Sequence, residues 1–264
     1  MGSYLAAVWR CRYFWLSLVK NDLRTRYRRS VLGMGWSLLH PICMTAILTA
    51  VFYKMFDQKE QPITAYAPYV LAGLAAWNYI LTVVNHGCHC FFIGESYIRQ
   101  YPAPLAIYPL RTALGGTVHF LLALLVVVLF SWCLNGFQGV SALASLVPTI
   151  FLLFIFAWSA AVLAGVANVY FQDTQHLTEV GFQMLFYATP IIYPEKLLEG
   201  NQLGWLLLNL NPLLPLMKLV RLPILDGAVP SLIDFTVAVV IVVVTLLAAS
   251  WTLSRLQRRL IFYL

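Results

Sequence analysis

Charged residues along this chain are separated by long stretches that carry no charge at all. Because a charged side chain is costly in hydrocarbon, such stretches mark candidate transmembrane helices, which need roughly 20 apolar residues each. The longest have 24 residues between Arg29 and Lys54, 34 between Glu60 and Glu95, 61 between Arg111 and Asp173, and 20 between Asp234 and Arg255. This spacing predicts an all-α polytopic membrane protein.

The third of these stretches is long enough for two helices, joined by a tight turn at Asn135-Gly136-Phe137-Gln138-Gly139. A shorter apolar segment, residues 177–193, carries Glu179 and is counted as a further span. The pattern therefore predicts six transmembrane helices. Their approximate ranges are 33–56, 66–93, 112–134, 142–168, 177–193 and 232–254.

The residues before the first span have the spacing of an amphipathic helix over residues 4–29. Apolar residues recur at intervals of three or four, which places them on one helical face, and the arginines fall elsewhere. The members of the apolar face are Trp9, Tyr13, Leu16, Val19, Leu23 and Tyr27. Because such a helix lies flat at a membrane surface, residues 1–32 are predicted to form an N-terminal amphipathic interfacial helix.

Residues 194–231 contain apolar stretches that are too short to span a membrane and too apolar for a free loop. They are predicted to form short external re-entrant helices before the last span, because protein can cover their backbone there. The whole chain, 1–264, is then a single transmembrane domain. Its parts are the interfacial helix (1–32), spans 1–5 (33–193), the external helices (194–231), the last span (232–254) and a tail (255–264).

The composition supports a membrane protein and indicates its orientation. The chain is 61% hydrophobic and 10% charged, whereas a soluble domain carries about 25% charged residues. Twelve of the 17 Lys and Arg residues lie before the first span, in the segment 94–111 or in the tail. The positive-inside rule therefore places both termini in the cytoplasm.

The sequence contains few candidates for catalytic chemistry. It has no G-x-x-x-x-G-K-[ST] phosphate loop, and no paired carboxylates occur within the predicted spans. The segment His86-Gly87-Cys88-His89-Cys90 offers metal ligands but lacks a second ligand pair. His40 is interpreted as an interfacial histidine, with a pore-facing role as the alternative. We expect no catalytic residue, no metal site and no nucleic-acid partner.

Five segments, in order, resemble the ABC-2-type permeases, in the branch that exports polysaccharides such as O antigen, capsule and teichoic acid. They are RTRYRRSVLGMGWSLLHPICMTAILTAVFYKMF, YVLAGLAAWNYI, YIRQYPAPLAIYPLR, YFQDTQHLTEVGFQMLFYATPIIYP and NPLLPLMKLVRLPILDG. Two places depart from the family pattern. Arg99-Gln100-Tyr101-Pro102 stands where a Lys-x-x-Phe-Pro core is common, and Gln172-Asp173 stands where Arg-Asp is common.

The resemblance implies the permease subunit of an ATP-driven exporter. Its cargo would be a polyprenyl-pyrophosphate-linked, O-antigen-like polysaccharide that crosses the bacterial inner membrane from the cytoplasm. It also implies a homodimer that works with two copies of a cytoplasmic ATPase subunit. That subunit would bind ATP and Mg, so the permease itself needs no cofactor.

Candidate residues follow from this resemblance and from the residue types. Arginine forks match a pyrophosphate headgroup, although the same cluster also serves as a topology signal and as a contact for anionic membrane lipid. The headgroup candidates are Arg24, Arg26, Arg28 and Arg29. Aromatic rings pack on sugar faces, and the candidates to line a glycan channel are Trp77, Tyr79, Phe91, Phe92, Tyr97, Phe154, Trp158, Tyr170 and Tyr187.

Two further groups of candidates lie at opposite ends of the predicted bundle. The candidates for docking the ATPase are Arg99, Tyr101, Pro102, Pro104 and Tyr108. The candidates for an external gate are Asn211, Pro212, Lys218 and Arg221. Three alternative functions stay open: an exporter of drugs or another hydrophobic cargo, an integral-membrane enzyme acting on polyprenyl phosphate, and a structural membrane partner.

Overall fold

The computed structural model describes residues 2–28, 30–31, 33–55, 62–101, 103–136, 139–198, 200 and 202–264. Within these ranges all regular structure is helical, which confirms the all-α prediction for this part of the chain. The elements are α1 (Gly2–Arg10), α2 (Arg12–Tyr27), α3 (Trp36–Met55), α4 (Ile63–Gln100), α5 (Ile107–Asn135), α6 (Val140–Ala144), α7 (Leu146–Tyr170), α8 (Thr174–Ala188), α9 (Gln202–Leu210), α10 (Leu213–Leu225) and α11 (Leu232–Leu260), with 3₁₀ turns at Gly33–Gly35 and Glu195–Leu198.

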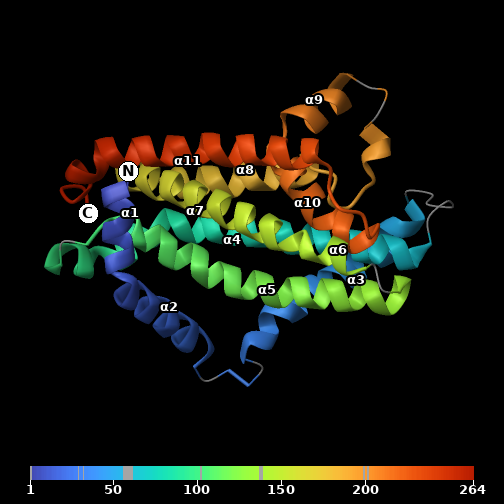
Figure 1. Ribbon diagram of the computed structural model, residues 1–264, viewed down its shortest axis with the longest axis horizontal. Helices are drawn as coiled ribbons and strands as arrows, with labels where there is room; N and C mark the ends of the chain where they lie inside the picture. Colours follow the sequence, from blue (N-terminus) through green and yellow to red (C-terminus); the bar gives the residue numbers. More distant parts are fainter. Residues whose placement is uncertain are drawn as a thin grey trace.

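The long helices form an elongated bundle, and both chain termini lie at the same end of it, which we call the terminal end (Figure 1). Five helical segments in the described ranges are long and apolar enough to cross a membrane. They are Gly33–Tyr53, Ile63–Gln100, Ile107–Asn135, Val140–Tyr170 and Leu232–Gln257. These match the first four predicted spans and the last one, so six complete spans are not confirmed.

The segment predicted as the fifth span, residues 177–193, is helical only as far as Ala188. With 15 residues, α8 is about 22 Å long, which is shorter than the hydrocarbon layer of about 30 Å. The ring of Pro190 disfavours helical backbone at the residue before it, and Thr189 is extended, with φ −100° and ψ 133°. The proline therefore ends the helix, and residues 189–194 continue without helical structure.

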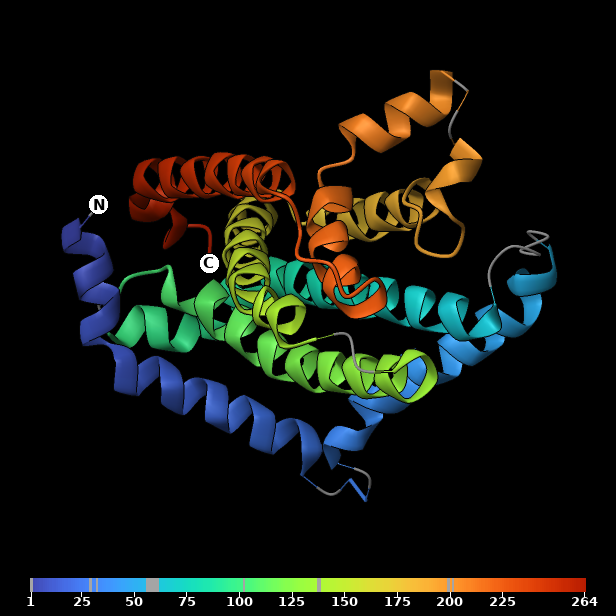
Figure 2. The same ribbon diagram turned by 45° about the vertical axis from the view of Figure 1, so that its right-hand side comes forward.

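The helix α4 lies at the centre of the bundle. It packs against α5 on one side and α7 on another, and it also contacts α3, α8 and α10 (Figure 2). Most of α4 between Tyr66 and Phe91 is buried and contributes to the main hydrophobic core. A second hydrophobic cluster lies around Phe91 and Tyr108, where α4 and α5 meet residues of α1, α7 and α11.

The helices α4 and α7 approach each other closely at two glycines. A methyl group added at Gly87 would lie 2.7 Å from the Cβ of Ala161 and 2.8 Å from its Cα. A methyl group added at Gly165 would lie 2.7 Å from the carbonyl oxygen of Gly87. Close by, Asn168 Nδ2 donates a hydrogen bond to the Cys88 carbonyl at 2.8 Å. Small residues permit helix contacts of this kind in membranes.

Local sequence explains where α11 begins and where α5 ends. The Ser231 side chain accepts a hydrogen bond from the backbone N–H of Asp234, whose carboxylate accepts from the Ser231 N–H, so α11 begins with a capping box. At the end of α5, Gly136 has a φ of +82°, a conformation that glycine adopts without steric cost. Phe137 and Gln138 of the predicted turn lie outside the described residues.

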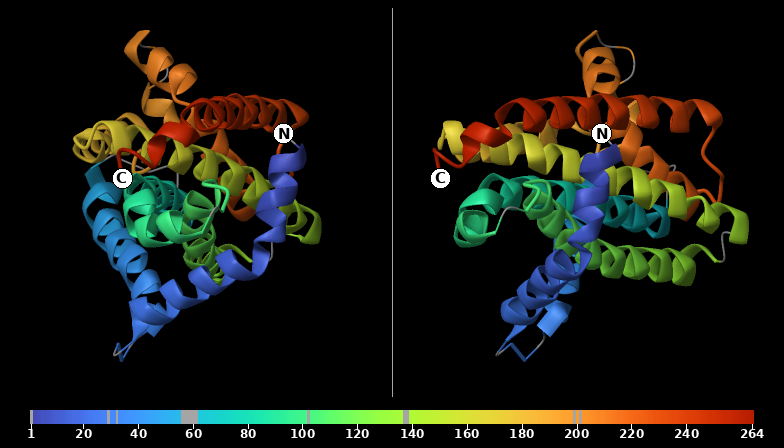
Figure 3. Two further views of the ribbon diagram at one scale, coloured as in Figure 1. Left: turned by 90° about the vertical axis from the view of Figure 1, so that its left-hand side faces the viewer. Right: turned by 60° about the vertical axis from the view of Figure 1, so that its left-hand side comes forward.

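The N-terminal segment forms two helices instead of the single amphipathic helix that was expected. The helices α1 and α2 meet at Cys11, and α2 then runs across the bundle to the start of α3 (Figure 3). On the predicted apolar face, Trp9, Tyr13 and Leu16 are exposed, whereas Val19 is buried. The outer part of this face is therefore available to a membrane or a partner, and its inner part packs within the chain.

An ion pair fastens α2 to α5. The Arg111 guanidinium donates from Nε and Nη2 to both carboxylate oxygens of Asp22. Since the Asp22 side chain is 41% exposed, solvent screens the pair, and we expect Asp22→Asn to weaken docking of α2 by about 1 kcal/mol or less. The measurement is the rate of hydrogen exchange of the α2 amides, which should be faster in this variant than in the wild type. Glu95→Gln, which removes a pair with Arg99 within α4, is the control, and equal exchange in both variants would contradict this role of Asp22.

Candidate functional site

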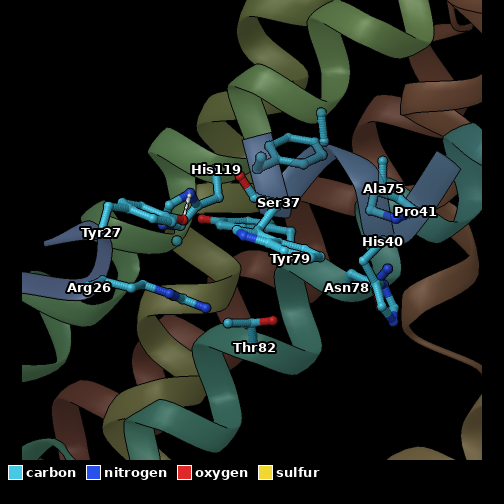
Figure 4. A pocket seen from close by; sticks show the side chains of 14 residues that line it. Arg26, Tyr27, Ser37, His40, Pro41, Ala75, Asn78, Tyr79, Thr82 and His119 are labelled. Atoms are coloured by element: carbon cyan, nitrogen blue, oxygen red, sulfur yellow. Dashed lines mark hydrogen bonds between the residues drawn. The ribbon is translucent and has the colours of Figure 1, made fainter. Parts of the chain in front are cut away.

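A cavity of about 300 Å³ lies where the end of α2 and the start of α3 meet the middle parts of α4 and α5 (Figure 4). We call it the α2–α5 pocket. Its lining residues are Arg26, Tyr27, Trp36, Ser37, His40, Pro41, Ala75, Asn78, Tyr79, Thr82, Gly116, His119, Phe120 and Ala123. Four helices, three of them candidate spans, thus contribute to one site.

Two contacts between helices hold the aromatic wall of the pocket. The Tyr27 hydroxyl of α2 hydrogen-bonds the His119 imidazole of α5, with 3.2 Å between Oη and Nδ1, and the two rings meet edge to face at 5.6 Å. The Tyr79 ring of α4 stacks on Phe120 of α5 at 4.8 Å, and its hydroxyl shares a hydrogen bond of 3.0 Å with Thr117. The pocket is therefore formed by ordered side chains from both long helices.

The described lining of the pocket carries a positive charge and several available hydrogen-bonding groups. It includes the guanidinium of Arg26 and two imidazoles, and no carboxylate is among the lining residues. The side chains of His40, Asn78 and Thr82 have no hydrogen-bond partner among the described residues. A site of this composition suits an anion with several acceptor oxygens.

The pocket lies at a defined level of the bundle. The helix α3 has 20 residues and is therefore about 30 Å long, which matches the thickness of a bilayer's hydrocarbon layer. Trp36, Ser37 and His40 belong to its first turns and line the pocket, and from there α3 runs away from the terminal end (Figure 1). A membrane that matches α3 would have one surface at the level of this pocket.

The four predicted headgroup arginines do not form one cluster. Arg24, Arg26 and Arg28 are all exposed, and of these only Arg26 lines the pocket. Arg29 lies outside the described residues. The structure therefore separates one arginine, which belongs to a cavity, from its neighbours at the surface.

The predicted channel aromatics are dispersed over the bundle. Trp77 and Phe91 are buried in the core, and Trp77 packs edge to face on Phe182 and Phe186. Phe154 and Trp158 stack on each other, and the Trp158 indole donates to the Ala106 carbonyl at 3.3 Å. These rings contribute to packing within one chain.

The remaining channel candidates have different surroundings. Tyr97 contacts the ring of Phe14 in α2, and Tyr170 contacts the ring of Tyr263. Phe92 is half-buried, and Tyr187 is 67% exposed on α8. Of the nine candidates, Tyr79 is the one that lines the α2–α5 pocket. One chain alone therefore does not assemble these aromatics into a continuous wall, and a role in a channel stays a prediction.

The predicted docking residues divide into exposed and buried ones. Arg99 and Tyr101 are exposed, Pro104 is half-buried, and Pro102 lies outside the described residues. Tyr108 is only 1% exposed, and its ring packs against Phe91 and Gly94. Tyr108 therefore has no surface to offer a partner subunit in this conformation, because the second hydrophobic cluster encloses it.

Among the external gate candidates, Arg221 of α10 makes the most contacts. It is 4% exposed and donates to the carbonyls of Pro190 and Ile191 at 2.8 and 3.2 Å. It also donates to the Tyr69 hydroxyl at 3.1 Å and lies 3.8 Å from the centre of the Tyr69 ring. Burial lowers the pKa of Arg221, while nearby Tyr69 and Glu195 oppose that shift. The guanidinium thus satisfies the non-helical backbone that follows α8.

The other gate candidates support the same region from α10 and from the two residues before it. Asn211 donates to the Thr189 hydroxyl at 2.6 Å and accepts from the Leu213 N–H, while Pro212 caps the start of α10. Lys218 forms a salt bridge of 3.0 Å with Glu195. The helix α10 packs against α4, α7 and α11, whereas α9 stands apart from the bundle (Figure 2). The structure therefore shows a connected network here; a gating movement stays a prediction.

Several residues of these sites were not recognised from the sequence. Tyr66 and Tyr69 donate to carbonyls of residues 190–193, and Asn78, Thr82 and His119 line the pocket. The spacing of Asn78 and Thr82, four residues apart in a long charge-free stretch, was an available signal for a polar strip on one helix face. In the described residues, no three His, Cys, Asp or Glu side chains converge as in a metal site.

Comparison with known proteins places these features in a family. The chain is 24% identical over 196 residues to the O-antigen export system permease protein RfbA of Klebsiella pneumoniae, covering 74% of each chain. It is 25% identical over 236 residues to the protein of the same name from Myxococcus xanthus, covering 89% of each. It is 20% identical over 230 residues to the polysialic acid transport protein KpsM of Escherichia coli, covering 87% of this chain and 88% of that protein.

The match extends beyond individual relatives. Residues 13–225 match the family described as ABC-2 type transporter, and this range contains the α2–α5 pocket and the network around Arg221. The five apolar helices agree with a multi-pass membrane protein. The chain therefore belongs to the ABC-2 type transporter family.

Proposed function

We propose that this chain is the membrane-spanning permease subunit of an ATP-driven exporter of a polyprenyl-pyrophosphate-linked, O-antigen-like polysaccharide. The direction of transport is from the cytoplasm to the outer face of the bacterial inner membrane. The observation that carries this proposal is the extent of the similarity to permeases named for O-antigen export, which covers up to 89% of both chains. The position of both termini at one end of the bundle (Figure 1) is compatible with both being cytoplasmic.

The energy for transport comes from a second subunit in this proposal. The sequence has no phosphate loop, so a separate ATPase binds ATP and Mg. Its docking surface is at the terminal end of the bundle, where Arg99 and Tyr101 are exposed. The helices α1 and α2 lie beside this surface, and the Tyr4 hydroxyl of α1 accepts a hydrogen bond from the Ala106 N–H at 3.2 Å.

The transported polymer passes between two copies of the chain in this proposal. The described interior of one bundle is filled with packed side chains around α4, whereas α8 has an outward apolar face. That face consists of Leu177, Val180, Met184 and Tyr187, each more than half exposed. These residues are three or four positions apart, so they share one helix face. A second copy of the chain would cover this face and place Tyr187 beside the conduit.

Each end of the bundle has a separate role in the proposed cycle. The exposed Arg24 and Arg28 attract the anionic carrier lipid to the membrane surface, because arginine pairs well with phosphate. At the other end, the Arg221 network and the segment 189–194 form the external mouth that opens for the polymer.

Deletion of the gene in its bacterial host tests this function. We expect surface polysaccharide to disappear while lipid-linked polymer accumulates inside, and the wild-type gene to restore export. Unchanged surface polysaccharide together with a new drug sensitivity would favour the alternative cargo. Loss of polyprenyl phosphate turnover without accumulated polymer would favour a membrane enzyme.

A further inference from the structure

The α2–α5 pocket contains polar groups that the packing of the bundle does not explain. Asn78 and Thr82 lie on one face of α4, inside a stretch of 34 residues without a formal charge. Their side chains have no hydrogen-bond partner among the described residues. Polar groups in an apolar segment are costly unless they bind water or a ligand. Their position on a shared cavity therefore suggests a ligand.

The charge of the described lining selects the class of ligand. Arg26 brings a permanent positive charge, His40 and His119 bring imidazoles, and none of the lining residues is acidic. Figure 4 shows Arg26 reaching from the end of α2 toward the part of α4 that carries Thr82. A guanidinium together with amide, hydroxyl and imidazole donors matches the acceptor oxygens of a phosphate group.

The apolar part of the pocket indicates what else the ligand carries. Part of the cavity wall is aromatic and consists of Trp36, Tyr79 and Phe120. The cavity volume of about 300 Å³ is at the lower end of the range for ligand pockets. The pocket also lies where α3 begins, and a membrane that matches the length of α3 would have its surface there. A phosphate that is attached to an apolar chain would satisfy both the polar and the apolar parts of such a site.

We propose that the α2–α5 pocket binds a ligand that carries a phosphate or diphosphate group on an apolar chain. Arg26, Asn78 and Thr82 are the principal polar contacts of the phosphate, and the aromatic side chains of the pocket lie beside it. The site lies within a single chain and needs no second copy. This inference rests on the proposed function only for the suggestion that the ligand is the lipid carrier of the exported polymer.

The test is a binding measurement on the full chain in phosphatidylcholine nanodiscs, with radiolabelled farnesyl diphosphate as the probe. We expect saturable binding that inorganic pyrophosphate displaces and farnesol does not. Arg26→Gln should lower the affinity about tenfold, the effect of losing one charge-assisted hydrogen bond. Lys20→Gln removes an exposed positive charge from the same helix outside the pocket, and it should change affinity by less than about twofold.

A second variant keeps the result interpretable. Asn78→Ala removes a donor from α4 and should also weaken binding, and all variants are compared by gel filtration and thermal unfolding. Tighter binding of farnesyl diphosphate than of pyrophosphate identifies a lipid ligand, whereas equal binding of both identifies a free phosphate compound. The proposal is overturned if farnesol competes as well as farnesyl diphosphate, or if neither Arg26→Gln nor Asn78→Ala changes binding. Normal surface polysaccharide after gene deletion would instead refute the export function and leave the binding result standing.

Discussion

Replacement of Arg221 by Ala is expected to lower the free energy of unfolding by about 3 kcal/mol and to abolish export. The change removes donors from the carbonyls of Pro190 and Ile191, which follow the end of α8. It also leaves an empty volume beside Gly73, where an added methyl group would overlap the Arg221 guanidinium. The Ile191 carbonyl loses its side-chain donor and carries the full cost of desolvation, whereas the Pro190 carbonyl keeps the Tyr69 hydroxyl as a donor at 2.9 Å. The gap adds a further cost.

The measurement is unfolding by sodium dodecyl sulfate in mixed micelles, combined with export by the same variant. Lys218→Met is the matched control on the same helix. Its salt bridge with Glu195 is partly exposed, with the two side chains 39% and 28% accessible, so its loss should cost about 1 kcal/mol or less. Equal stability of the two variants would show that Arg221 does not hold residues 189–193 in place.

Substitution of Gly87 by Ala is expected to destabilise the bundle by about 1–3 kcal/mol, because the new methyl group overlaps Ala161 of α7. The overlap involves the Cα of Ala161 at 2.8 Å as well as its Cβ, so a change of rotamer cannot relieve it. The helices α4 and α7 would have to separate, which would also weaken the hydrogen bond from Asn168 to the Cys88 carbonyl.

Gly115→Ala in α5 is the control for this second prediction. A methyl group there would meet no atom within 4 Å beyond its chain neighbours and the nearby backbone of α5, and alanine favours helix over glycine by roughly 0.5–1 kcal/mol. The two substitutions should therefore shift the thermal unfolding of the purified protein in opposite directions. A Gly87→Ala variant as stable as the wild type would contradict the close contact between α4 and α7.

Some parts of the candidate sites could be predicted from sequence, but their combination could not. Arg26 was predicted as a headgroup residue and Tyr79 as a channel aromatic, and the structure brings both into one pocket. Tyr108 was predicted at a docking surface because of its neighbours in sequence, but it is buried under packing from other helices. Periodicity and residue type are local properties, whereas the pocket depends on contacts between four separate helices.

The distribution of charge alone determined that this is a helical membrane protein and where five of its long apolar segments lie. Stretches such as 112–134 and 232–254 reappear within α5 and α11, because the cost of charge in hydrocarbon acts on each segment independently of its neighbours. Only the tertiary structure decided that Arg221 of α10 supports the non-helical chain beyond α8. A buried non-helical backbone is stable only when other residues supply its hydrogen bonds, and no local pattern specifies which distant residues those are.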